Sequence, residues 1–175
     1  CRPAGLQPRY PMAQTFDDTV PQAIRHYLDR IGALLAKLDG PPDGDARLAT
    51  RLAPDMFETG FHLAVAIRFA ARALGPPNGI EVPDIPEDAS VADLRRYHQE
   101  IAILVAPLSA PANGTEIIHQ AGDAVLRQDP ADYVARFAFP SMIFHFGIAY
   151  AALRADGLAI GKADFDGLHR YDDPT

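Results

Sequence analysis

The stretch FAFPSMIFHFGIAYAAL, residues 137–153, decides the fold of this chain. It contains no Asp, Glu, Lys or Arg, and its few polar side chains are those of Ser141, His145 and Tyr150. A helix that is apolar all round has no face suited to water, so protein must cover both of its sides. The stretch therefore predicts a helix that lies between the core of its own chain and a second surface.

Residues that start and stop helices mark the two ends of this segment. Asp129 can cap the free amides and Pro130 fits the first turn, while Gly157 follows the last apolar position. The predicted helix therefore covers residues 130–155. Inside it, Pro140 has no amide hydrogen and crowds the preceding turn, so we expect a kink there.

A membrane-spanning helix is the alternative interpretation of residues 137–153. The stretch is short of the roughly 20 apolar residues that a span needs, and it contains Pro140 and a central His145. We expect instead that a helical bundle covers one side and a second copy covers the other, in a homodimer. No membrane partner is predicted.

Three further segments have apolar residues at spacings of three and four, which is typical of amphipathic helices. They predict helices over residues 17–39, 55–74 and 90–106. Asp55 with Glu58 and Ser90 with Asp93 have the spacing of capping boxes at the starts of the second and third helices. A carboxylate pair for proton transfer is the alternative interpretation of Asp55 and Glu58, and capping is favoured.

Two connections bear on the topology. Residues 75–89 include four prolines, and fully extended they span roughly 50 Å, which is longer than the helices they join. The order of helices in the bundle therefore stays open. Between the third and fourth helices, β-prone pieces at 116–119 and 124–126 predict a small hairpin that turns at Gly122.

Length and composition fit one soluble domain. The 175 residues include 16 Lys plus Arg against 23 Asp plus Glu, a formal net charge of −7, so nucleic acid is not an expected partner. We expect a flexible arm at 1–16, a single helical domain at 17–167 and a flexible tail at 168–175. Cys1 alone cannot form an intrachain disulfide, and no signal segment is recognised, so a cytoplasmic location is expected.

The six histidines are the candidates for acid–base or metal chemistry. His26 projects to the wet side of its helix, His169 lies in the tail and His119 in a loop piece, so these three are set aside. The other three project toward the interior from three different helices, and Tyr97 and Tyr150 are additional hydrogen-bond donors. The candidate ligand pocket consists of His62, Tyr97, His98, His145 and Tyr150.

The number and spacing of the same histidines decide whether a metal site is predicted. A catalytic zinc needs three protein ligands, and positions 141, 142, 148 and 149 give His145 no ligand one turn away. No tightly bound metal and no other cofactor is therefore predicted. The alternative is a divalent metal such as zinc or nickel held by His62, His98 and His145.

Several segments together resemble a known family. They are FAFP at 137–140, FHF at 144–146, AYAALR at 149–154, GKADF at 161–165, RLAPDMF at 51–57 and TVP at 19–21. Over residues 13–167 they resemble the domain-of-unknown-function nineteen-ninety-three family, which is similar to DinB/YfiT-like four-helix bundles. Many of those bundles are metal-binding dimers, and some are thiol-dependent transferases or hydrolases. The resemblance implies an all-α, antiparallel four-helix bundle that dimerises and has a cavity near the middle of its helices.

The resemblance carries over only part of the DinB-like metal site. Those bundles place one ligand histidine on the second helix and a His-x-x-x-His pair on the fourth. His62 and His145 match two of these positions, whereas Ala149 and Ser141 leave the third without a ligand. We therefore expect a small-molecule-binding bundle whose histidines act without a tightly bound metal. The alternatives are a DinB-like metal-dependent transferase or hydrolase, and a non-catalytic structural or interaction dimer.

Overall fold

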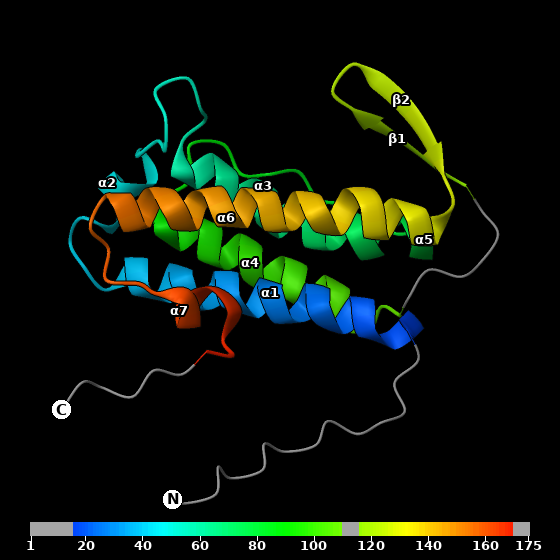
Figure 1. The fold of residues 1–175 in the computed structure, drawn as a ribbon, viewed down its shortest axis with the longest axis horizontal. Coiled ribbons are helices and arrows are strands. Elements are labelled where there is room, and N and C mark those ends of the chain that lie inside the picture. Colours follow the sequence, from blue (N-terminus) through cyan, green and yellow to red (C-terminus); the bar gives the residue numbers. More distant parts are fainter. Residues whose placement is uncertain (1–15, 110–115, 170–175) are drawn as a thin grey trace, which may run out of the picture.

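The structure is a computed structural model that describes residues 16–109 and 116–169. Four long helices lie side by side in it (Figure 1). They are α1 (Phe16–Asp39), α3 (Thr59–Leu74), α4 (Val91–Val105) and α6 (Phe139–Ala155). Most of the predicted arm at 1–16 and the last six residues of the predicted tail lie outside the described residues.

Shorter elements join the long helices. They are α2 (Gly44–Leu48), the 3-10 turn η1 (Pro76–Asn78), strands β1 (Ile117–Ala121) and β2 (Ala124–Gln128), α5 (Pro130–Tyr133), the π-helical turn η2 (Val134–Ala138) and α7 (Lys162–Asp166). Helix α7 lies against α1, and the hairpin projects from the end of the molecule where α5 begins (Figure 1).

The connection between α3 and α4 runs back along the length of the helices, so these two helices point in the same direction (Figure 1). Helix α6 packs antiparallel on α3, and α4 packs antiparallel on α1. The order is therefore not a simple up-down-up-down one. The long, proline-rich connection makes this topology sterically accessible because it spans a whole helix.

Two helix starts confirm the capping predictions. At α4, the Asp93 amide donates to Ser90 Oγ over 3.1 Å and the Ser90 amide donates to Asp93 Oδ2 over 3.0 Å, which completes a capping box. At α5, the Asp132 amide donates to Asp129 Oδ1 over 2.9 Å, and Pro130 follows this cap.

The predicted start of the second helix at Asp55 is wrong. Helix α3 begins at Thr59, and its N-cap residue Glu58 makes no side-chain capping bond. The Glu58 carboxylate instead pairs with Arg51, with 2.7 Å between Oε1 and Nη2. An ion pair with the preceding loop has replaced the predicted capping box, so Asp55 and Glu58 do not form one.

The predicted hairpin is confirmed. Strands β1 and β2 are antiparallel, and the last pair in their register joins Ala121 to Ala124. Gly122 has a φ of 59°, a left-handed conformation that glycine adopts without steric penalty. The fold is therefore mostly helical with one small sheet of two strands in the described residues.

A π-helical turn, η2, lies directly before the segment in which the sequence predicts a kink at Pro140. The amide of Phe139 bonds the carbonyl of Val134, five residues back, just before α6 reaches Pro140. Pro140 has no amide hydrogen to give to the carbonyl of Arg136, and the wider turn accommodates the proline ring ahead of this position. Helix α6 then continues regularly to Ala155.

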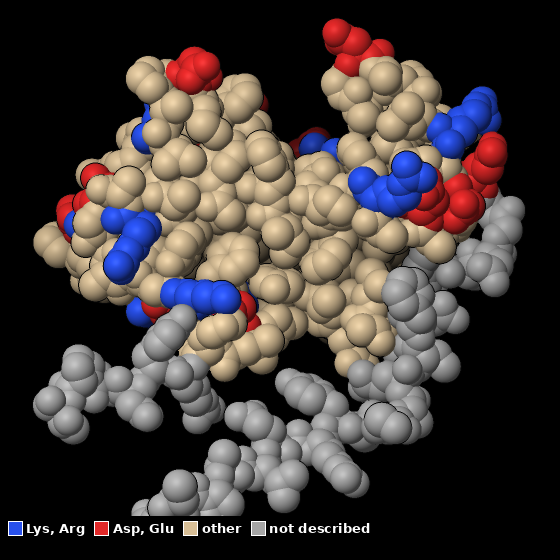
Figure 2. Space-filling view, in the orientation of Figure 1, with Lys and Arg blue, Asp and Glu red and all other residues tan. Residues whose placement is uncertain are grey.

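One face of α6 is open. The continuous helical segment Pro130–Ala155 is long and apolar enough to span a membrane, a property that core helices of soluble proteins can share. In its most apolar window of 18 residues, 28% is buried. The helix packs on α3, and its inner residues Met142, Phe146 and Ala149 are fully buried, with Phe146 stacked on Phe165 of α7. Figure 2 shows that the surface over the middle of α6 has no charged side chains.

Candidate functional site

Two of the predicted site residues meet between α3 and α6. His62 Nδ1 lies 2.9 Å from His145 Nδ1, a hydrogen-bond distance. Both residues belong to the apolar faces by which these antiparallel helices pack, and His62 is only 3% exposed. Helix packing therefore brings two residues that are 83 positions apart in sequence into one imidazole pair.

Aromatic rings surround this imidazole pair. The ring of Phe69 stacks on His145 with 5.9 Å between centroids, and the edges of Phe61 and Phe144 face the same imidazole. On the other side, the buried atom His62 Nε2 has no hydrogen-bond partner in the described part of the chain. A buried polar atom without a partner is unfavourable, and in the described residues His119 Nδ1 is in the same condition.

Burial sets the protonation state of the pair. It lowers the pKa of His62, and burial together with the neighbouring His62 ring lowers the pKa of His145 to about 4. Both effects disfavour an added positive charge in an apolar environment. Near pH 7 both imidazoles are therefore neutral, and one donates its Nδ1 proton to the other.

His98 does not join the pair. Its Nε2 donates to the carbonyl of Leu28 over 2.9 Å, across the interface between α1 and α4. Its ring fills the space above Gly32, where a β-carbon would lie 2.6 Å from His98 Cε1. His98 also lines a hollow of about 270 Å³ together with Asp29 and Arg95. Its place in the fold is explained by packing between helices.

The two predicted tyrosines also lie elsewhere. Tyr97 is buried, its hydroxyl donates to the carbonyl of Pro83 over 3.3 Å, and burial raises the pKa of this phenol to about 12. Tyr150 packs edge-on against Phe165 of α7. The five residues predicted for one pocket are thus distributed over four places in the fold, and the structure brings together His62 and His145.

The donor set does not fit the metal centre implied by the DinB-like resemblance. Residues 16–109 and 116–169 contain no group of three or more His, Cys, Asp or Glu side chains arranged to hold a metal ion. The imidazole pair offers two nitrogens, His98 faces α1, and position 149 is an alanine buried in the core. A catalytic zinc centre with three protein ligands is therefore not assembled from these residues.

The three histidines predicted to lie outside the pocket are all hydrogen-bonded, and His169 contacts the carboxylate of Asp166. His26, predicted to face water, is half-buried and donates through Nε2 to the carbonyl of Asp166 over 2.7 Å. His119, assigned to a loop piece, lies in β1 at 9% exposure with Nε2 2.7 Å from Gln128 Oε1. The alternation of Ile117 and His119 on one face of a strand is the signal that could have placed His119 inside.

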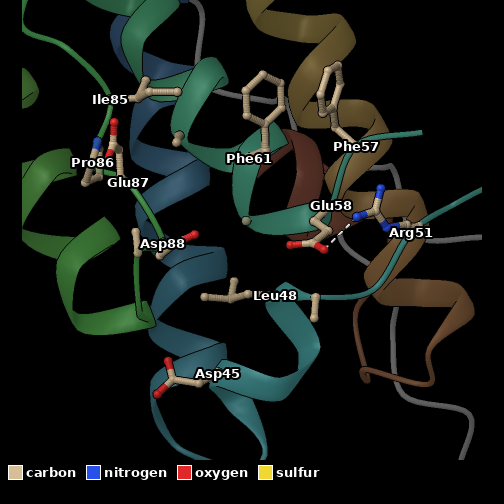
Figure 3. A pocket seen from close by; sticks show the side chains of 14 residues that line it. Asp45, Leu48, Arg51, Phe57, Glu58, Phe61, Ile85, Pro86, Glu87 and Asp88 are labelled. Atoms are coloured by element: carbon tan, nitrogen blue, oxygen red, sulfur yellow. Dashed lines mark hydrogen bonds and ion pairs between the residues drawn. The ribbon is translucent and has the colours of Figure 1, made fainter. Parts of the chain in front are cut away.

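A pocket of about 610 Å³ lies beside the imidazole pair, and none of the five predicted residues lines it. It opens between α2, the start of α3 and the segment 85–89 (Figure 3). Its side chains include Asp45, Leu48, Phe57, Glu58, Phe61 and Asp88. Phe61 separates this pocket from the imidazole pair, because its ring centroid lies 6.0 Å from that of His62 and 6.5 Å from that of His145.

Comparisons with known proteins agree with the fold described above. A crystal structure of a DinB family member protein from Shewanella denitrificans is similar to this chain, with a TM-score of 0.70 and 24% sequence identity over 89% of this chain and 93% of that chain. This likeness concerns the fold. The comparison with curated proteins gives no match. The model of the family described as "Domain of unknown function (DUF1993)" matches residues 15–166, so the chain belongs to the DUF1993 family.

Proposed function

We propose that this protein is a four-helix bundle that binds a small organic molecule, and that the His62–His145 pair acts on this molecule as a general base. The observation that carries the proposal is the 2.9 Å contact between the two Nδ1 atoms. It is supported by the buried, unpartnered Nε2 of His62 in the described chain. Paired imidazoles in an apolar helix interface are unfavourable for stability alone, which favours a functional role.

The proposed general-base step depends on which ring carries the proton between the two Nδ1 atoms. When His62 donates its Nδ1 proton to His145, His62 Nε2 carries a lone pair that can accept a proton from an O–H, S–H or C–H group. The resulting imidazolium keeps its hydrogen bond to the neutral His145 ring. This charge-assisted bond stabilises the positive charge that proton transfer creates.

Metal-dependent chemistry is the alternative that the DinB-like resemblance offers. It would use His62 and His145 as two of its ligands, and the described chain supplies no third ligand beside them. In the proposed function, proton transfer therefore uses the two imidazoles alone. A non-catalytic bundle is the other alternative, in which His62 and His145 only satisfy one another.

A ligand screen monitored by thermal unfolding tests the proposed function. We expect a small-molecule library to contain compounds that stabilise the wild-type protein but not the His145→Phe variant. Phe fills the space of the imidazole, so this variant should fold, with a modest fall in its unfolding temperature because His62 Nδ1 loses its partner. Ile103→Ala, a change at a position of α4 that is 76% exposed, should keep the ligand response.

The opposite result would support the structural role. If no compound stabilises the wild type and His145→Phe is strongly destabilised, the pair serves the packing of α3 on α6 and the proposed function is wrong. A library in which every stabilising compound also stabilises His145→Phe would contradict it too, because no ligand would then depend on the imidazole pair.

A homodimer is proposed through the open face of α6. Phe144 is 60% exposed on this uncharged surface, and a contiguous apolar face of this kind is typical of protein interfaces. A second copy in a closed twofold arrangement would cover it. A cytoplasmic location remains a prediction from the sequence, as does the absence of nucleic-acid and membrane partners.

A further inference from the structure

The pocket of about 610 Å³ has an aromatic wall that faces solvent. The rings of Phe57 and Phe61 lie with 4.3 Å between centroids and 30° between planes, and Phe57 is 63% exposed. Leu48 and Ile85 extend the apolar surface on neighbouring walls (Figure 3). A concave apolar surface of this volume matches the pockets that hold small molecules.

The remaining side chains make the pocket negatively charged. Four carboxylates line it, those of Asp45, Glu58, Glu87 and Asp88, against the single guanidinium of Arg51. Arg51 is paired with Glu58 over 2.7 Å. Glu87 and Asp88 make no ion pair or hydrogen bond with other described residues, so their charges are free to face a ligand.

The carboxylates are placed on opposite walls. Asp88 reaches into the pocket from the segment 85–89, and Glu58 reaches toward it from the start of α3, with the Phe61 ring to one side (Figure 3). Asp45 is held in place because its Oδ1 accepts the amide of Val91 over 2.7 Å. Carboxylates spread around an apolar surface suit a positive charge carried on an apolar body.

A bare metal ion fits this arrangement poorly. The described residues contain no group of three carboxylates or imidazoles that converges on a point, as a cation such as Ca²⁺ requires. An organic cation is larger and does not need convergent ligands. Its charged group can contact one or two carboxylates while its apolar part contacts the aromatic rings.

We propose that this pocket binds an organic cation, with its protonated amine between Asp88 and Glu58 and its apolar or aromatic body against Phe57 and Phe61. The inference goes beyond the proposed function, because neither His62 nor His145 lines this pocket and its ligand is bound without them. Phe61 lies between the pocket and the pair, so a ligand in the pocket is separated from the two imidazoles by this ring.

Three probes of the same shape and different charge test the inference on the full chain. They are 2-phenylethylammonium, neutral 2-phenylethanol and anionic phenylacetate, each titrated by calorimetry. We expect the ammonium compound to bind at least tenfold more tightly than the other two, and its binding to weaken as salt is added. Equal affinity for the three probes, or tighter binding of phenylacetate, would overturn the inference.

Matched variants locate the site. Asp88 has a φ of 44°, a conformation that Asn tolerates, so Asp88→Asn removes the charge without backbone strain. We expect Asp88→Asn and Phe61→Leu each to weaken the ammonium probe about fivefold or more. Glu81→Gln removes an exposed carboxylate from the same connection outside the pocket and should leave affinity unchanged. Equal effects of Asp88→Asn and Glu81→Gln would contradict the assigned site.

Two further measurements separate this inference from the proposed function. Binding of the ammonium probe should persist in His145→Phe, because the carboxylates and the aromatic wall are intact. Selective binding of the ammonium probe, together with a library that contains no compound dependent on His145, would leave the inference standing and remove the proposed function. A calcium chloride titration that displaces the ammonium probe at equal concentration would identify an inorganic cation site and overturn the inference.

Discussion

The ring of His98 occupies the space that a side chain at Gly32 would need, since a β-carbon there would lie 2.6 Å from His98 Cε1 and 2.7 Å from His98 Nε2. The ring cannot easily move, because Nε2 donates to the carbonyl of Leu28 over 2.9 Å. Glycine at position 32 thus allows α1 and α4 to approach each other closely, with an imidazole between them.

This contact predicts that Gly32→Ala destabilises the protein. Alanine should favour the helix by up to about 1 kcal/mol, but the clash and the displaced hydrogen bond should outweigh this and give a net loss of about 1–3 kcal/mol. Gly147→Ala is the matched control, because nothing lies within 4 Å of a β-carbon at that helical position. Urea unfolding at neutral pH measures both, and an increase in stability for Gly32→Ala would contradict the prediction.

The imidazole pair predicts a loss of stability in mild acid. The pKa of His145 is about 4 in the folded protein and about 6.5 in an unfolded chain. Between these values the unfolded state binds more protons, so stability present above about pH 6.5 falls as the pH falls toward 4. His62, whose pKa is also lowered, adds to the same trend.

Urea unfolding at several pH values checks this dependence. The His145→Phe variant should lose less stability on acidification than the wild type, by on the order of 2 kcal/mol at pH 4. Ile103→Ala, at an exposed position of α4, removes no titratable group and should retain the wild-type slope. Identical slopes for His145→Phe and the wild type would show that the folded pKa of His145 is not lowered.

The open face of α6 predicts a dimer that a charge can disrupt. Light scattering should give twice the chain mass of 19.0 kDa for the wild type and a single chain mass for Phe144→Asp, because a buried unpaired carboxylate is unfavourable in an apolar interface. Val125→Asp changes an equally exposed residue of the hairpin, which is 70% exposed, and should remain dimeric. A monomeric wild type would refute the predicted dimer.

The donor set predicts that the purified protein holds no stoichiometric zinc, nickel or iron. Two imidazole nitrogens lack the third ligand on which much of the apparent zinc-binding free energy depends. Elemental analysis of protein purified without added metal measures this directly. One metal ion per chain that disappears in His62→Ala or His145→Ala would instead establish the metal-dependent alternative.

The local features of the fold were predictable from the sequence. Each of these features depends on residues that are close together in the sequence. They are the caps at Ser90 and Asp129, the turn at Gly122 and the apolar stretch 137–153. Their signals are therefore complete in a short window. Asp55 and Glu58 show the limit, because the ion pair between Glu58 and Arg51 competes with capping and moves the helix start to Thr59.

The site depended on tertiary structure. Helical periodicity placed His62, His98 and His145 on inward faces. It gives no information on how far the helices are shifted along one another in the bundle. Packing of α3 on α6 brought His62 to His145, while packing of α4 on α1 took His98 to Leu28. The pocket lined by Phe61 and Asp88 joins a helix start to a distant loop, and only the path of the connection between α3 and α4 brings these residues together.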